Sequence, residues 1–107
     1  MTTFDDRERA FETKFAHDEE LRFRVIARRN RLLGQWAARL MGLSDAEADA
    51  YAKDVIRADF EEAGDEDVIR KLLGDLVSAG VDTDEARIRA ALEAKQIEAR
   101  RALMGGV

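Results

Sequence analysis

The sequence predicts an all-α protein, a small four-helix bundle with a mobile N-terminal amphipathic arm. The 107-residue chain is 38% charged and 7% aromatic and contains no proline, a composition typical of helices with long solvated faces. Its apolar residues recur every three or four positions, which is the period of amphipathic helices. This periodicity stops at Gly42, Gly64 and Gly80, where helix C-termini are therefore expected.

The predicted arm comprises residues 1–18. Thr3 is placed to cap a helix, and on that helix Phe4, Phe11 and Phe15 fall within about 40° of one another. A stripe this short buries little area, so the segment is expected to be marginally stable alone. Two interpretations stay open. The segment extends the first bundle helix and packs on the core, or it becomes ordered only when its phenylalanines enter a cleft in a partner.

The bundle is expected over residues 19–107, with helices at approximately 19–41, 45–62, 66–78 and 84–103. Connections of two to four residues predict antiparallel neighbours. The third helix carries the widest apolar face, formed by Val68, Ile69, Leu72, Leu73, Leu76 and Val77. Gly34 and Gly74 interrupt periodic segments and cost about 1 kcal/mol each relative to alanine. Close approach of two helices would explain them.

The helix starts carry capping signals. Ser44 and Glu47 form a Ser-x-x-Glu capping box at the second helix. The run Asp65-Glu66-Asp67 supplies a cap and a negatively charged first turn for the third helix. Either Thr83 or Asp82 is expected to cap the fourth.

The net charge of −5 is distributed unevenly along the chain. Residues 21–43 carry six arginines and no acid, whereas residues 44–67 carry ten acids and two bases. The first two bundle helices are therefore expected to lie side by side with attractive charges at their rims. Surface pairs contribute only a few tenths of a kcal/mol each, so they favour the arrangement more than they stabilise it.

Catalytic chemistry is not expected from this sequence. The chain has no cysteine and a single histidine, His17, in an acidic flank, where a solvated helix residue is the ordinary interpretation. Phosphate-binding, dinucleotide-binding and zinc-protease motifs are absent. The acidic run at residues 59–67 lacks the spacing of a calcium-binding EF-hand loop. We predict a protein that is not an enzyme, with no cofactor and no metal site.

The arginine-rich run Arg22–Arg31 could suggest nucleic-acid binding. The sequence pI of 4.9 argues against it, because a net-anionic protein gains little from counterion release. We expect no nucleic-acid partner and interpret the run as a solvated, partly paired helix face. No apolar stretch is long enough to cross a bilayer, and no signal peptide is recognisable, so the expected compartment is the cytoplasm.

The sequence resembles the zeta subunit of α-proteobacterial F-type ATP synthases. The runs that carry the resemblance are residues 1–12 (MTTFDDRERAFE), 14–18 (KFAHD), 27–34 (ARRNRLLG), 36–38 (WAA), 59–61 (DFE), 64–68 (GDEDV) and 70–72 (RKL). Several uncommon runs in the same order make the resemblance specific over roughly the first two-thirds of the chain. From Gly74 to Val107 it extends only to helical, charged character.

The resemblance implies an inhibitor of ATP hydrolysis whose mobile arm inserts at a catalytic α/β interface near the central stalk. The implied partners are the α, β and central-stalk subunits, which would hold the protein on the cytoplasmic face of the inner membrane. By position, the buried anchors would be Phe4, Phe11 and Phe15. The polar contacts would be Arg7, Arg9 and Lys14.

Weak nucleotide binding on the bundle is left open by the resemblance. An alternative function is a helical bundle that senses a nucleotide or another small ligand. A further alternative is a structural adaptor whose basic helix binds an acidic protein.

Overall fold

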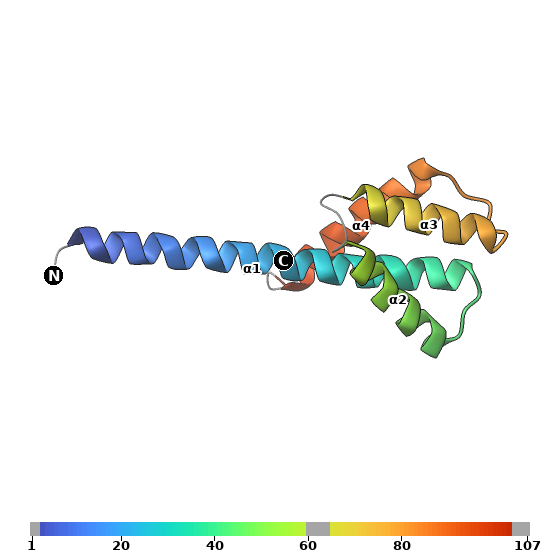
Figure 1. The fold of residues 1–107 in the computed structure, drawn as a ribbon, viewed down its shortest axis with the longest axis horizontal. Helices are drawn as coiled ribbons and strands as arrows, with labels where there is room; N and C mark the ends of the chain where they lie inside the picture. The colour runs from blue at the N-terminus through green and yellow to red at the C-terminus, as the bar shows by residue number, and fades with distance from the viewer. Residues whose placement is uncertain (1–2, 60–64, 104–107) are drawn as a thin grey trace.

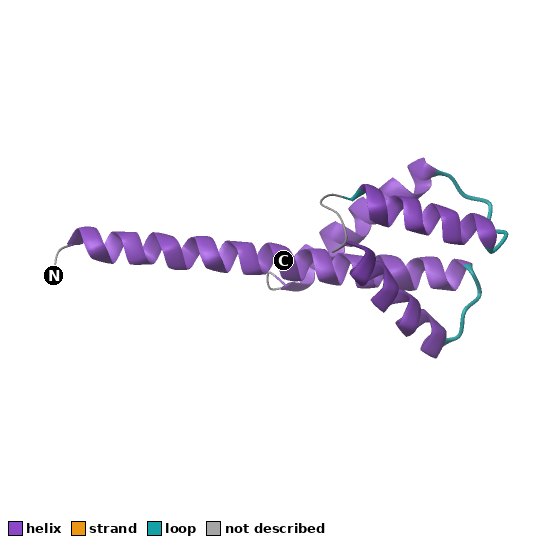
Figure 2. Ribbon diagram, viewed as in Figure 1, coloured by secondary structure: helices purple, strands orange, loops and turns teal. Residues whose placement is uncertain are grey.

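The computed structural model describes residues 3–59 and 65–103, with side chains for residues 19–58 and 65–103. This part of the chain contains four helices and no strand: α1 (Thr3–Leu40), α2 (Asp45–Asp59), α3 (Glu66–Ser78) and α4 (Glu85–Leu103). Figure 2 shows loops and turns at residues 41–44 and 79–84. The predicted all-α, four-helix fold class is confirmed. Residues 60–62 of the predicted second helix lie outside the described residues.

Helix α1 runs without interruption through the predicted boundary between arm and bundle. The sequence predicts a helix start at residue 19, whereas the observed helix begins at Thr3. The physical reason is that residues 16–22 contain neither glycine nor proline to end a helix. Figure 1 shows α2, α3 and α4 packed around the C-terminal half of α1, while its N-terminal half projects beyond them. The arm is therefore the projecting end of α1, and its mobility stays a prediction.

The hydrophobic core lies between the C-terminal half of α1 and the other three helices. It consists of Leu33, Ala37, Val55, Val68, Ile69, Leu72, Leu76, Ile88 and Leu92. Helix α3 contributes four of these side chains, in agreement with its wide apolar face. Val77 is an exception, because 57% of its surface is exposed. The prediction that Val77 belongs to the buried face is wrong, because Val77 lies at the edge of a face centred on Leu72 and Leu76.

The close approach suggested for the two interior glycines holds for one of them. A Cβ atom added to Gly34 would lie 2.7 Å from the Cα atom of Ala52 and 3.3 Å from a methyl group of Val55. Glycine therefore lets α1 and α2 pack backbone to backbone. A Cβ atom on Gly74 would meet nothing within 4 Å, so close packing does not explain Gly74.

The local signals at the ends of helices are largely confirmed. Gly42 and Gly80 adopt φ angles of +74° and +81°, as a glycine that follows a helix C-terminus does. The amide of Glu47 donates to Ser44 Oγ at 3.2 Å, and the amide of Ser44 donates to Glu47 Oε1 at 3.1 Å. These two bonds complete the predicted capping box.

The predicted cap of α4 is wrong, whereas that of α3 is right in position and in its acidic first turn but not in its hydrogen bond. The Asp84 carboxylate, rather than Thr83 or Asp82, accepts the amide hydrogen of Arg87 at 2.8 Å. Asp65 stands at the cap position of α3, but its side chain makes no capping hydrogen bond. The Asp65 carboxylate has a different partner, described below.

Helices α1 and α2 lie side by side, as expected, but the rim ion pairs predicted between them are not observed among the described side chains. The ion pairs of exposed groups in this part of the chain lie within one helix or join α3 to α4. The pair Arg89–Glu66 (2.8 Å) is the interhelical example. Because the described acidic side chains of α2 are exposed, apolar packing and the Gly34 contact hold α2 against α1.

Candidate functional site

The six predicted partner-binding residues all lie on the projecting half of α1. Phe4, Arg7, Arg9, Phe11, Lys14 and Phe15 belong to its helical backbone, and their side chains lie outside the described ones. Figure 1 shows no other helix alongside this half of α1. The helical backbone places the three phenylalanines on one face. Their role as anchors, and that of the three cations as polar contacts, stays a prediction.

The packing of α1 in the bundle begins near Val25. Glu20 and Arg24 are exposed and form an ion pair at 2.7 Å along the helix surface. Leu21 is half-buried, and Val25 is the first residue along α1 whose described side chain is buried. The arm thus joins a firmly packed helix within about two turns of residue 18.

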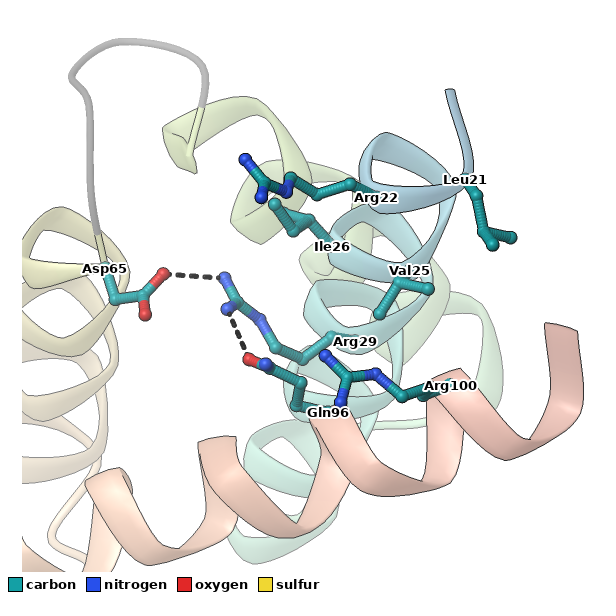
Figure 3. A pocket seen from close by; sticks show the side chains of 8 residues that line it. All are labelled: Leu21, Arg22, Val25, Ile26, Arg29, Asp65, Gln96 and Arg100. Atoms are coloured by element: carbon teal, nitrogen blue, oxygen red, sulfur yellow. Dashed lines mark hydrogen bonds and ion pairs between the residues drawn. The ribbon is translucent and has the colours of Figure 1, made fainter. Parts of the chain in front are cut away.

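Arg29 of α1 is a buried cation, with only 2% of its surface exposed. Its Nε and Nη2 atoms donate to Asn30 Oδ1 at 3.1 and 3.0 Å, and its Nη1 atom donates to Gln96 Oε1 at 3.1 Å. Its Nη2 atom also lies 3.0 Å from Asp65 Oδ1. Figure 3 shows the Asp65 and Gln96 side chains converging on the guanidinium group from two sides. Burial of a charge is tolerated when it is paired and hydrogen-bonded in this way.

This contact explains why Asp65 leaves the helix cap. Its carboxylate faces Arg29 of α1 instead of the first amides of α3. Gln96 supplies the corresponding contact from α4. One guanidinium group therefore ties α1 to the start of α3 and to the middle of α4.

The interpretation of Arg22–Arg31 as a solvated face is wrong for Arg29. The available signal is its position four residues from both Val25 and Leu33, which are buried on the same face of α1. An arginine on an apolar face indicates a buried polar network. Arg22, Arg24, Arg28 and Arg31 are exposed, as that interpretation requires.

An open cavity of about 610 Å³ lies beside Arg29. Its polar lining comes from Arg22, Arg29, Arg100, Gln96 and Asp65, and its apolar lining from Leu21, Val25 and Ile26. Figure 3 shows that the charged groups come from α1, from α4 and from the start of α3. Three guanidinium groups and one carboxylate make this lining suited to an anion that also has an apolar part.

A polar cluster joins α2 to α3. The Tyr51 hydroxyl donates to Asp75 Oδ2 at 2.7 Å, and Lys71 Nζ reaches the same carboxylate oxygen at 3.1 Å. Burial, reinforced by the hydrogen bond to Asp75, raises the pKa of Tyr51 far above its ordinary value. A phenol held protonated in this way serves as a hydrogen-bond donor between helices.

The described residues contain no cluster of three or more histidine, cysteine, aspartate or glutamate side chains able to hold a metal ion. Within the same ranges, none of the helices combines the length and apolar character needed to cross a membrane.

Comparisons with known proteins agree with the resemblance seen in the sequence. A solved structure, determined by solution NMR, is 47% identical to this chain and superimposes with a TM-score of 0.71. The similarity covers 81% of this chain and 99% of that one. No curated protein matches.

The sequence pattern of the family described as "ATPase inhibitor subunit zeta" matches residues 1–102. The match includes the arm, all of α2 and α3, and all of α4 except its last residue, Leu103. The similarity to the family therefore extends well beyond the first two-thirds of the chain. The chain therefore belongs to the ATPase inhibitor subunit zeta family.

Proposed function

We propose that this protein inhibits ATP hydrolysis by the F-type ATP synthase by inserting the projecting half of α1 at a catalytic α/β interface near the central stalk. The single observation that carries the proposal is the long helix α1, of which only the C-terminal half is packed in the bundle (Figure 1). The family to which the chain belongs supports the inhibitory role. The protein acts as a stoichiometric binder without a cofactor and does not catalyse a reaction.

No other described helix covers the arm (Figure 1). A single helix without tertiary contacts is marginally stable in water, so an apolar stripe on it favours docking into a partner's groove. Phe4, Phe11 and Phe15 are the aromatic anchors in this proposal. Arg7, Arg9 and Lys14 supply polar contacts to acidic surfaces of the catalytic subunits.

The bundle acts as a body too wide to follow the arm. Its core and the Arg29 network join α1 to the other three helices, so a force on the arm is resisted by the whole bundle. In this proposal the partners are the α, β and central-stalk subunits, and the protein is held at the cytoplasmic face of the inner membrane through the ATP synthase.

The test compares two variants of the full chain in an assay of ATP hydrolysis by the purified cognate enzyme. Phe11→Ala with Phe15→Ala removes two anchors, and we expect it to weaken inhibition by at least about tenfold. Asp6→Ala with Thr13→Ala is the matched control, because both residues lie on the opposite face of the helix. Equal inhibition by the wild type and the phenylalanine variant would rule out the arm as the inhibitory element. Circular dichroism checks that both variants keep a cooperative melt.

A second candidate function, sensing of a nucleotide or another small ligand, is favoured by the cavity beside Arg29. Its guanidinium groups suit phosphates, and Leu21 and Ile26 offer an apolar surface. In an NMR titration with ATP, we expect shift changes at these residues that are lost in Arg22→Ala with Arg100→Ala. Shift changes that survive the double substitution would assign binding to another place.

A further inference from the structure

A second groove lies between α1, α2 and α4. It has a volume of about 620 Å³ and is lined at its rim by Arg24, Arg28 and Arg31. Its apolar floor includes Leu32 of α1, Ile56 of α2 and Leu103 of α4, each half-buried. The groove therefore has a positive rim and an uncovered apolar floor built from three helices.

The arginines of this rim are available to a partner. Their spacing of four and three residues places them along one face of α1. Arg24 pairs with Glu20 at 2.7 Å, but both side chains are more than half exposed. Arg28 and Arg31 make no ion pair with any side chain that the structure describes, and no carboxylate belongs to the groove lining. Guanidinium groups in this state favour carboxylates, which they can bind through two parallel hydrogen bonds.

The arginine rim of the groove and the arm belong to the same helix. Arg24 follows Phe15 by nine residues, which corresponds to about 14 Å of helix rise. A protein that binds the arm is therefore within reach of the groove. The unbroken α1 fixes the direction in which the groove faces relative to the arm.

We infer that this groove docks an acidic amphipathic helix on the surface of the F-type ATP synthase head, next to the place where the arm enters. This inference rests on the proposed function. The partner helix would present carboxylates at a spacing of three or four residues to the arginine rim. Apolar side chains on its adjoining face would cover Leu32, Ile56 and Leu103.

Charge complementarity and the apolar floor together select this partner. A nucleic acid would pair its phosphates with the rim but leave the floor in contact with water, and the acidic residues 44–67 of this chain would repel it. Rim charges of this kind mainly accelerate association and fix orientation.

The experiment uses the full chain and the purified cognate catalytic head. Arg28→Glu with Arg31→Glu reverses two rim charges, and Arg70→Glu with Arg87→Glu makes the same change in charge on exposed residues of α3 and α4. We expect the groove variant to bind about tenfold or more weakly, with a smaller dependence of affinity on salt. Its inhibition at saturation should remain complete, because the arm is intact. The control variant should bind like the wild type.

Three results would overturn the inference. They are equal affinity of the groove variant and the wild type, equal weakening of both charge-reversed variants, and loss of maximal inhibition by a folded groove variant. Two further measurements test the other occupants. Self-association of the wild type that the groove substitutions abolish would assign the groove to a second copy. Binding of single-stranded RNA that they abolish would assign it to nucleic acid.

The outcome is distinguishable from failure of the proposed function. The phenylalanine variant should weaken both binding and inhibition, whereas the groove variant should lower affinity and its salt dependence while inhibition at saturation stays complete. If the phenylalanine variant inhibits fully, the proposed arm is wrong, and weak binding by the groove variant would still support the groove. In a chain that carries both sets of substitutions, the residual affinity of the phenylalanine variant should fall again by about tenfold.

Discussion

The Nη2 atom of Arg29 lies 3.0 Å from Oδ1 of Asp65, so a buried cation of α1 is paired with the first residue before α3. The two residues have very different surroundings, since Arg29 is almost fully buried whereas the Asp65 side chain is 47% exposed. Gln96 and Asn30 bind the same guanidinium group. The pair thus sits at the place where α1, α3 and α4 meet, between the arm and the core.

Replacing Asp65 by alanine should destabilise the bundle by about 1–2 kcal/mol. Loss of one partner of a buried charge is costly, but Asp65 is partly solvated and Arg29 keeps its amide partners. Thermal melting followed by circular dichroism measures the change. Asp82→Ala removes a carboxylate from an exposed loop and serves as the control. A melt of Asp65→Ala no lower than that of the control would show that the pair does not stabilise the fold.

Alanine should have opposite effects at the two interior glycines. Gly34→Ala places a methyl group 2.7 Å from the backbone of Ala52, so we expect α2 to be displaced and stability to fall by about 2 kcal/mol. Gly74→Ala meets no neighbour within 4 Å and should raise stability by up to about 1 kcal/mol. Urea denaturation of both variants measures the two changes. Effects of the same sign would contradict the assigned role of Gly34.

The capping box should make the stability of α2 depend on acidic pH. Hydrogen bonding to the backbone of Ser44 lowers the pKa of Glu47 from its ordinary value of 4.5. A lowered pKa in the folded state means that this stabilisation is present above pH 4.5 and is lost as pH falls through the folded-state pKa. The difference in melting temperature between the wild type and Glu47→Ala should therefore be larger at pH 7 than at pH 3. Ser44→Ala removes the hydroxyl that accepts from the Glu47 amide but keeps the backbone amide that donates to the Glu47 carboxylate, so its effect on the melting temperature should depend less on pH.

Tyr51 should ionise only when the protein unfolds. Burial and the hydrogen bond to Asp75 raise its pKa well above the ordinary value of 10.0. A raised pKa means that the stabilisation is complete below pH 10 and declines as pH rises beyond it. Since the chain has one tyrosine, its absorbance in an alkaline titration should rise together with the loss of helical signal. A phenolate signal in a still-folded protein would contradict this assignment.

Removing the Tyr51 hydroxyl measures how much its hydrogen bond contributes to stability between α2 and α3 at neutral pH. Tyr51→Phe removes the donor to Asp75 but leaves Lys71 paired with that carboxylate. We expect a loss of about 1 kcal/mol, the usual net contribution of one hydrogen bond. A stability equal to that of the wild type would show that the hydrogen bond contributes nothing and that only packing of the Tyr51 ring stabilises this contact.

The features that could be predicted from the sequence are those whose causes are local. Ser44 and Glu47 bond to each other across three residues, and Gly42 ends a helix through its own φ angle. The cap of α4 was harder to assign, because Asp82, Thr83 and Asp84 are neighbouring residues that can all cap. Only the exact helix start distinguishes them.

The Arg29 network could not be predicted in full for a different reason. Its partner Gln96 is 67 residues away in the sequence, so the pairing depends on how the helices pack. The boundary at residue 18 illustrates the reverse case. The phenylalanine stripe and the family resemblance predict a separate arm, but backbone continuity depends on helix-breaking residues, and that stretch of α1 has none.

The continuity of α1 sets a rotational phase between the arm and the bundle. Each residue of an α-helix turns the chain by about 100° and advances it by about 1.5 Å. One residue inserted between residue 18 and Val25 would swing the phenylalanine stripe by more than a quarter turn relative to the arginine rim. Seven inserted residues would nearly restore the angle and lengthen the helix by about 10 Å. The number of residues in α1 therefore sets both the angle between the phenylalanine stripe and the arginine rim and the distance between them.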